Sequence, residues 1–256
     1  MRNGVGYQNL DVAAQAAGGY SYLVCTLPSV GKDYKDIQLK DLIVVPPEGG
    51  LTADISVFVT TFTSEGQREN EYLYIDQAQV DAGTGGVETP GWYTKDSVDN
   101  WTPVSADEEK LPFGTGFIVS SDCGAKITCA GEVAGELTWD IASAAEGGYT
   151  YTGNTSPVKV KLEDIGITPP EGGLTADISV FVTTFTSEGQ RENEYLYIDE
   201  AQVAAGTGGV EEPGWYTKDS VDNWTPVPAG QDEIEAGRMF IISSDCGAKI
   251  TIPSAL

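Results

Sequence analysis

The sequence of 256 residues contains no histidine, few basic residues and no long apolar run. The lack of histidine excludes Ser-His-Asp triads, cysteine nucleophiles paired with histidine, and the commonest side-chain ligand of zinc and iron. No segment approaches the roughly 20 consecutive apolar residues of a membrane-spanning helix. No P-loop is present, and no Gly-x-Gly-x-x-Gly run precedes a predicted helix, which excludes nucleotide binding through these motifs.

Basic side chains are scarce, with 14 lysine and arginine residues against 39 acidic ones and a net charge of −25. Such a surface repels phosphate backbones and anionic headgroups, so nucleic acid and membranes are poor partners. Association between copies of the chain therefore needs specific local contacts or bound cations. Few lysines, many Thr, Ser, Gly and Tyr, and no apolar signal core after Met1 predict the mature form of an extracellular or cell-surface protein.

The four cysteines are Cys25, Cys123, Cys129 and Cys246. They lack Cys-x-x-Cys spacing, which argues against a structural zinc site. Cys123 and Cys246 are counterparts in an internal repeat, whereas Cys25 and Cys129 have no cysteine counterparts. Four cysteines allow three complete pairings, within or between chains, and the sequence does not choose among them. Alternatively, all four are buried thiols that act as small apolar side chains.

What the chain does contain is a repeat with an offset of 123 residues. The run PPEGGLTADISVFVTTFTSEGQRENEYLYID begins at Pro46 and again at Pro169. Only three positions differ between residues 46–104 and their counterparts. A fixed long period marks each copy as a folding unit. The sequence therefore predicts two domains, residues 1–129 and 130–256.

Each copy has the pattern of an all-β domain. Runs rich in β-branched and aromatic residues, separated by Gly, Pro and Asp turns, predict strands in the first copy at residues 5–12, 20–26, 37–45, 53–63, 71–75, 116–120 and 125–128. Residues 53–63 carry bulky side chains on both faces, which is typical of a central strand. Residues 76–83 predict one or two helical turns, with Asp76 as the cap and Gly83 as the stop. We expect two tandem Ig-like or jelly-roll-like β-sandwich domains, with a closed barrel as the alternative.

The junction between the copies contains no flexible Gly/Ser-rich or Pro-rich linker, so we expect a fixed orientation of the two domains. Residues 125–133 lead directly into the opening strand of the second copy at residues 135–141. The strand at residues 5–12 and the final run at 248–252 lack such a neighbour. If the last strand of one molecule meets the first strand of the next, assembly continues without closing. The residues expected to anchor this joint are Val5, Tyr7, Leu10, Ile252 and Leu256.

The most distinctive motif is GWYTKDSVDNWTP, which begins at Gly91 and returns at Gly214. The favoured interpretation is a long loop whose rings plug the end of the sandwich, because Trp is usually well buried. The alternative is that its aromatic rings form a saccharide platform, in which case a glycan is a partner. The platform residues would be Trp92, Tyr93, Trp101, Trp215, Tyr216 and Trp224.

Oxygen-bearing side chains in the same motif are candidate Ca²⁺ ligands, although the spacing Asp-x-Asp-x-Asp-Gly is absent. The candidates are Asp96, Asp99, Asn100, Asp219, Asp222 and Asn223. A pair of carboxylates among Glu65, Glu69 and Glu71 could serve a glycosidase, but a solvated turn and strand edge is the favoured explanation. We predict no catalytic residue, no cofactor and no bound metal beyond Ca²⁺, and an enzyme is the third hypothesis.

The order of these motifs resembles tandem-repeat β-sandwich domains of secreted bacterial surface and filament proteins. The shared features are a VGYxN-like strand at Val5, a GGYxY strand, a strand of the form hydrophobic-Lys-Leu-x-Asp-Ile, the GWY motif, the pair Gly116-Phe117 and a GEV segment at Gly131. The resemblance implies an extracellular building block and supplies no catalytic residues. Our leading hypothesis is a structural subunit of an extracellular filament or surface layer, assembling head-to-tail through terminal strands. A tandem carbohydrate-binding or adhesive module is the alternative.

Overall fold

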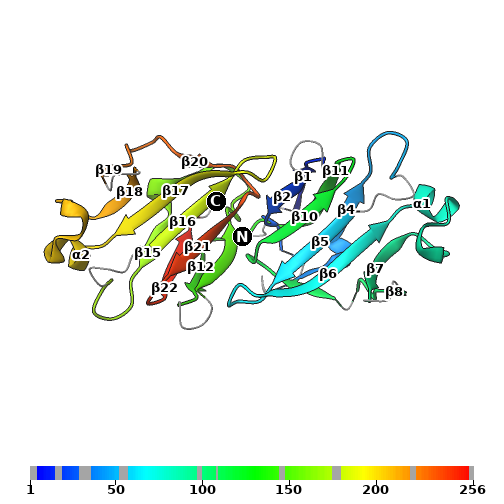
Figure 1. Cartoon of the computed structure of the whole chain (residues 1–256), viewed down its shortest axis with the longest axis horizontal. Coiled ribbons are helices and arrows are strands. Elements are labelled where there is room, and N and C mark those ends of the chain that lie inside the picture. Colours follow the sequence, from blue (N-terminus) through cyan, green and yellow to red (C-terminus); the bar gives the residue numbers. More distant parts are fainter. Residues whose placement is uncertain are drawn as a thin grey trace.

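The fold is all-β, in a computed structural model that describes residues 5–14, 19–28, 36–51, 57–96, 100–107, 109–143, 148–174, 180–219 and 223–253. Two similar sets of antiparallel sheets lie side by side along the long axis of the molecule (Figure 1). Each set contains a three-stranded, a six-stranded and a two-stranded sheet. This arrangement confirms the predicted tandem β-sandwich. Within the described ranges, no helix has both the length and the apolar character to cross a bilayer.

The first set of sheets, which we call half 1, spans residues 5–132. Its three-stranded sheet has the order β1 (Val5–Val12), β11 (Ala125–Glu132), β4 (Leu42–Val45). Its six-stranded sheet has the order β2 (Tyr20–Leu23), β10 (Phe117–Ser121), β5 (Val57–Phe62), β6 (Arg68–Ile75), β7 (Gly91–Lys95), β8 (Trp101–Pro103). The remaining elements are β3 (Asp36–Gln38), paired with β9 (Lys110–Pro112), the helix α1 (Gln77–Asp81), and the 3-10 helices η2 (Leu39–Asp41) and η3 (Thr84–Gly86).

The second set, half 2, spans residues 137–253 and repeats this order. Its three-stranded sheet is β12 (Leu137–Ile141), β22 (Ala248–Ile252), β15 (Gly166–Thr168). Its six-stranded sheet is β13 (Tyr149–Gly153), β21 (Met239–Ser244), β16 (Val180–Phe185), β17 (Arg191–Ile198), β18 (Gly214–Lys218), β19 (Trp224–Pro226). The other elements are β14 (Val160–Lys161), paired with β20 (Glu233–Ile234), the helix α2 (Glu200–Ala205), and the 3-10 helices η5 (Leu162–Asp164) and η6 (Thr207–Gly209).

The core of each half lies between its three-stranded and six-stranded sheets. In β5, Val57 and Val59 are fully buried, and this strand has a partner on each side, as predicted for a central strand. Ile127 of β11 packs into the same core from the opposite sheet. The alternation of buried and exposed residues follows from the two-residue period of a strand. Each fully buried aliphatic side chain contributes about 1.5–3 kcal/mol to folding.

The predicted helix is confirmed, and the same side chain caps it in both halves. The carboxylate of Asp76 accepts hydrogen bonds from the backbone N–H of Gln79 (2.9 Å) and of Leu51 (2.7 Å). Gln79 is fully buried, and its side chain accepts a bond from the Asp76 N–H, which completes a capping box. Gly83 follows the helix with φ of 80°, a left-handed conformation that favours glycine.

Two local predictions are wrong. Residues 37–45 form no continuous strand, because the chain leaves its pairing with β9 at Gln38, turns through η2 and joins β11 as β4. The GWY motif is no long loop, because β7 and β8 form a hairpin that extends the six-stranded sheet. In addition, β11 continues to Glu132, three residues past the boundary predicted after residue 129.

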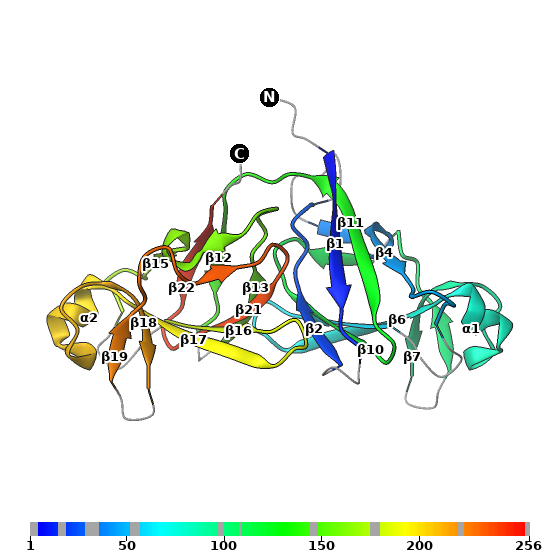
Figure 2. The ribbon, with the colours of Figure 1, turned by 90° about the horizontal axis from the view of Figure 1, so that it is seen from above.

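Two pairs of stacked rings join the halves. Tyr22 stacks on Phe185, and Phe62 stacks on Tyr151, each with ring centroids 3.9 Å apart. Tyr22 and Tyr151 are counterparts in the repeat, as are Phe62 and Phe185. The halves are therefore related by an approximate two-fold axis, in which each contributes the same surface to the contact. Figure 2 shows this arrangement, with α1 and α2 at opposite ends of the molecule.

Hydrogen bonds between the halves surround these rings. The N–H of Val24 donates to the carbonyl of Gly237 (2.9 Å), and the N–H of Gly116 donates to the carbonyl of Tyr151 (2.8 Å). The buried hydroxyl of Thr152 donates to the carbonyl of Gly114 (2.7 Å). These bonds and the stacked rings hold the halves in one orientation.

The strands expected to lack partners are paired inside their own halves. β1 pairs with β11 from Val5 to Val12, and β22 pairs with both β12 and β15. The expected joint between the end of one repeat and the start of the next is therefore not what connects them. β22 is the central strand of its sheet and is paired on both sides, whereas β1 is an edge strand that, among the described residues, is paired with β11 alone. The two halves meet through their faces instead.

Candidate functional site

The three-stranded sheet of half 1 has an outer face that points away from the core and exposes apolar side chains. The exposed fractions are 78% for Tyr7, 49% for Ile43 and 45% for Val45. Tyr7 comes from β1, and the other two come from the edge strand β4 on the other side of β11. Large apolar side chains exposed on one face mark a candidate contact surface, which here includes Thr128 and Lys126 of β11 between Tyr7 and the other two residues. We call Tyr7, Ile43 and Val45 the outer apolar patch.

Half 2 has no such patch at the corresponding positions. The repeat places Glu136, Gly166 and Thr168 where half 1 has Tyr7, Ile43 and Val45. All three counterparts are exposed. The two halves have the same sheets in the same strand order, so a difference in fold does not explain why these exposed residues differ. The patch therefore distinguishes half 1 by its surface chemistry.

Two charged residues on this face are paired with each other. Asp11 and Lys126, on neighbouring strands of this face, form an ion pair with an N–O distance of 3.7 Å. An exposed pair of this kind adds little to stability. It balances one negative charge on this face, whereas Glu132, which the two-residue period of β11 places on the same side as Lys126, is a further acidic residue there.

The structure separates the residues expected to anchor an assembly. Tyr7 is strongly exposed, whereas Leu10 and Ile252 are 4% and 1% exposed and belong to the cores of their own halves. These two side chains cannot anchor a neighbouring molecule, because the alternation of β1 and β22 turns them inward. Val5 begins β1. Leu256 lies outside the described residues.

The cysteines fall into two pairs with different surroundings. Cys25 and Cys129 are buried in the core of half 1, with their sulfur atoms 2.7 Å apart. Cys123 and Cys246 occupy equivalent turns of the two halves, where each thiol donates to the carbonyl of the following glycine at 3.4 Å. The repeat already separated Cys123 and Cys246 from the other two cysteines, but the sequence could not bring Cys25 and Cys129 together, because they are 104 residues apart.

In the GWY motif the first two rings are buried. Trp92 is 6% exposed and packs edge-on against Tyr74 in the core. Tyr93 is 4% exposed, and its hydroxyl donates to the carbonyl of Thr89 at 2.6 Å. Their counterparts Trp215 and Tyr216 are buried in the same way. The four rings therefore act as structural side chains rather than as an open platform.

The third ring of the motif is half-buried. The indole of Trp101 packs against Gly85, where an added Cβ would lie 2.7 Å from the ring. The ammonium of Lys95 lies 5.5 Å from the ring centroid. Trp224 has the same contacts with Gly208 and Lys218. This close packing reduces the ring surface that a saccharide could reach.

Of the calcium candidates, Asp96 and Asn100 are bonded to each other. The carboxylate of Asp96 accepts bonds from the backbone N–H and the side-chain amide of Asn100, at 2.9 and 2.8 Å. Asp219 and Asn223 repeat this clamp in half 2. Asp99 and Asp222 lie outside the described residues. In the part of the chain that the structure describes, no three Cys, Asp or Glu side chains are grouped to hold a metal ion.

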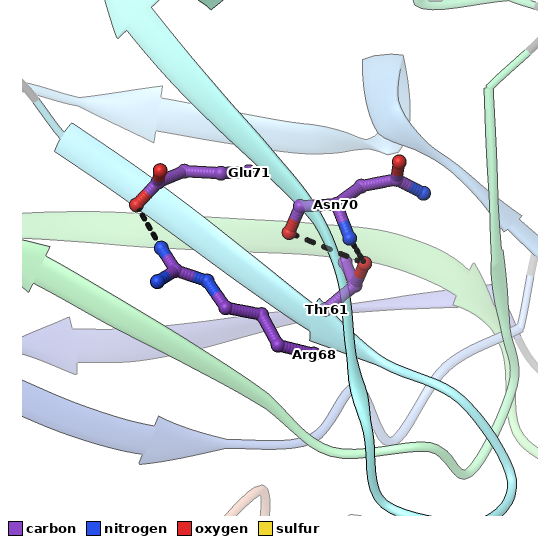
Figure 3. A network of polar contacts seen from close by, with 4 residues as sticks. All are labelled: Thr61, Arg68, Asn70 and Glu71. Atoms are coloured by element: carbon purple, nitrogen blue, oxygen red, sulfur yellow. Dashed lines mark hydrogen bonds and ion pairs between the residues drawn. The ribbon is translucent and has the colours of Figure 1, made fainter. Parts of the chain in front are cut away.

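The carboxylates considered for a glycosidase belong to the hairpin of β5 and β6. Glu71 forms an ion pair with Arg68, and the hydroxyl of Thr61 bonds the backbone of Asn70 at a bulge (Figure 3). The hydrogen bond from Ser64 lowers the pKa of Glu65, whereas a general acid needs a raised value. The group is thus a structural hairpin network.

Half 2 contains a polar pocket of about 400 Å³. Its lining includes Thr184, Glu192, Asn193, Tyr195, Asp232, Glu235 and Arg238. Burial, and then the charge of Asp232, raise the pKa of Tyr195 above its ordinary value. Glu235 is ion-paired with Lys159 at 2.7 Å. These side chains provide polar and charged groups but no nucleophile held against a base.

Comparisons with models of protein families, with curated proteins and with solved structures found no match to this chain. The function therefore has to be argued from the geometry of the chain itself.

Proposed function

We propose that the chain is a structural subunit of an extracellular filament or surface layer, and that it assembles head-to-tail with other copies of itself. The observation that supports this proposal most directly is the outer apolar patch of half 1. In this proposal, the surface of a second copy of the chain covers the patch.

The comparison between the halves favours a contact at this place. The helix cap and the hairpins recur in both copies, yet the residues at the patch positions are Glu136, Gly166 and Thr168 in half 2. Small and polar residues of this kind suit a face that stays in contact with water. Exposed Tyr, Ile and Val side chains gain free energy only when a partner removes them from water, at roughly 25 cal/mol per Å².

The charge of the chain favours the same place. Copies with a net charge of −25 repel each other over most of their surface. On the face that carries the patch, Asp11 and Lys126 are paired with each other. This pairing lowers the repulsion between like-charged copies at this place.

The edge of the sheet adds a second element of the contact. β4 ends the three-stranded sheet, so one side of its backbone lacks a strand partner. An apolar edge strand readily pairs with another chain. This edge replaces β22, which is paired on both sides, as the expected joint, and β1 at the opposite edge of the same sheet also has one side that no described strand pairs with. A patch that meets a different surface of the next copy gives a contact that does not close, and the assembly grows.

A matched pair of variants tests the proposal. Val45→Glu places a charge in the patch, whereas Thr168→Glu makes the same change at the corresponding position of half 2. We expect filaments or sheets in electron micrographs of the unmodified chain and of Thr168→Glu, and only single molecules for Val45→Glu. Monomers at every concentration for the unmodified chain, or equal assembly by both variants, would overturn it.

A further inference from the structure

The core of half 1 brings together two cysteines that come from opposite sheets of the sandwich. Cys25 follows β2 of the six-stranded sheet, and Cys129 lies in β11 of the three-stranded sheet. Their exposed fractions are 0% and 1%. A covalent bond at this place would tie the two layers of half 1 to each other.

The sulfur atoms of Cys25 and Cys129 are 2.7 Å apart. Such a distance is ordinary for two hydrogen-bonded oxygen atoms, but sulfur is a larger atom, so the two thiols are closer than non-bonded sulfur atoms. A disulfide has a bond length of about 2.05 Å. Only a small movement therefore separates this pair from a covalent bond.

The second half supplies an internal comparison. The counterparts of Cys25 and Cys129 are Asn154 and Ile252, so both members of the pair change together. The amide of Asn154 donates to the carbonyls of Val158 and Ile234, each at 2.8 Å. Half 2 thus fixes this segment by buried hydrogen bonds, and Ile252 fills the core. Half 1 has the two sulfur atoms at the same places.

The other two cysteines show the opposite pattern. Cys123 and Cys246 are counterparts, lie in different halves, and each donates its thiol to the next glycine carbonyl at the same distance of 3.4 Å. Both side chains are partly exposed. Because the two thiols have the same surroundings, neither has a bonding partner that the other lacks.

We propose that Cys25 and Cys129 form a disulfide that joins the two sheets of half 1, while Cys123 and Cys246 remain thiols. The oxidant is a disulfide compound, such as oxidised glutathione. A thiolate of the pair attacks it to give a mixed disulfide, and the second cysteine displaces the remaining thiol. The two cysteines lose two protons and two electrons, and the oxidant becomes two thiols.

The burial of the two thiols determines when the disulfide between Cys25 and Cys129 can form. Complete burial, followed by the hydrogen bond with Cys129, raises the pKa of Cys25. The reactive thiolate is therefore rare in the folded protein. Oxidation takes place while the chain folds and the thiols are accessible, and the finished bond is shielded from reductants. Such a bond fits a protein that folds in an oxidising compartment.

Peptide mapping of the full chain tests this assignment. The reduced, unfolded chain is refolded with oxidised and reduced glutathione, its free thiols are blocked in denaturant, and its peptides are analysed by mass spectrometry. We expect two of the four cysteines to be blocked, and the peptides of Cys25 and Cys129 to be linked. Blocking of all four cysteines, or a bond to Cys123 or Cys246, would overturn the proposal.

Thermal unfolding of matched variants gives an independent measurement. A Cys25→Ala/Cys129→Ala chain should melt about 5–15 °C below the oxidised chain, because the bond closes a loop of 104 residues. The control Cys123→Ser/Cys246→Ser keeps the linked peptides and the melting temperature of the oxidised chain. A control that loses the linked peptides contradicts the assignment.

Discussion

Gly116 in half 1 lies directly against Met239 in half 2, the residue at the same position of the repeat. A Cβ atom on Gly116 would lie 2.1 Å from the sulfur of Met239. The same relation holds for Val24 and Gly153, where a Cβ on Gly153 would lie 2.7 Å from Cγ1 of Val24. At each place one half has a glycine and the other a larger side chain. The two copies have thus become complementary to each other across the two-fold axis.

Exchange of the first pair tests this complementarity. Gly116→Met should cost about 1–3 kcal/mol by overpacking, and Met239→Gly should cost about 2–5 kcal/mol by leaving a cavity. The double variant Gly116→Met/Met239→Gly conserves the volume, so its loss of unfolding free energy in urea should be clearly smaller than the sum of the two. An additive double variant would show that these residues do not share one space.

The buried cap gives a second prediction, with its own repetition inside the chain. Asp76→Ala and Asp199→Ala should each lower the free energy of unfolding by about 2–4 kcal/mol, because each removes a helix cap and leaves a buried N–H, of Leu51 or Leu174, without an acceptor. Urea unfolding followed by circular dichroism measures the loss. The control Asp81→Ala changes an exposed residue whose counterpart is Ala204, and should cost less than about 0.5 kcal/mol.

Alkaline pH should weaken the fold through two buried tyrosines. Burial and the neighbouring carboxylate of Glu109 raise the pKa of Tyr72, and burial with Asp232 does the same for Tyr195. The folded chain then keeps protons that the unfolded chain releases, so this contribution is complete below about pH 10 and falls as pH rises further. Tyr72→Phe and Tyr195→Phe should each reduce the slope of stability against pH above that value. An unchanged slope in urea titrations would contradict this.

The GWY motif should fail to bind saccharides. Trp92 and Tyr93 are buried, and Trp101 packs on Gly85, so little ring surface is open to a sugar. Titration with a panel of oligosaccharides should therefore give no saturable change in tryptophan fluorescence. A saturable change that Trp101→Ala removes would instead support the carbohydrate-binding alternative. The variant Gly85→Ala places a Cβ against the indole of Trp101, so it tests the packing of this ring without removing the ring.

Sequence reasoning was most successful where the structure is local. The period of two along β5, the cap at Asp76 and the glycine at Gly83 each depend on neighbours only a few residues away. It failed at residues 37–45, where a run of suitable residues is divided by η2 because β3 and β4 pair with different strands. It also read the β7–β8 hairpin as a loop, although Trp92 and Thr94 alternate with Tyr93 and Lys95 there.

The sequence by itself determined the repeat, the all-β character, the turns, and the exclusion of histidine chemistry, because these follow from composition and short-range pattern. Only the tertiary structure decided that β1 and β22 are paired within their own halves, that the halves meet about a two-fold axis, and that Cys25 lies against Cys129. A local pattern determines which side of a strand is buried, but it does not determine which distant strand is its partner. That choice depends on the packing of residues more than a hundred positions apart, which no single segment of the chain contains.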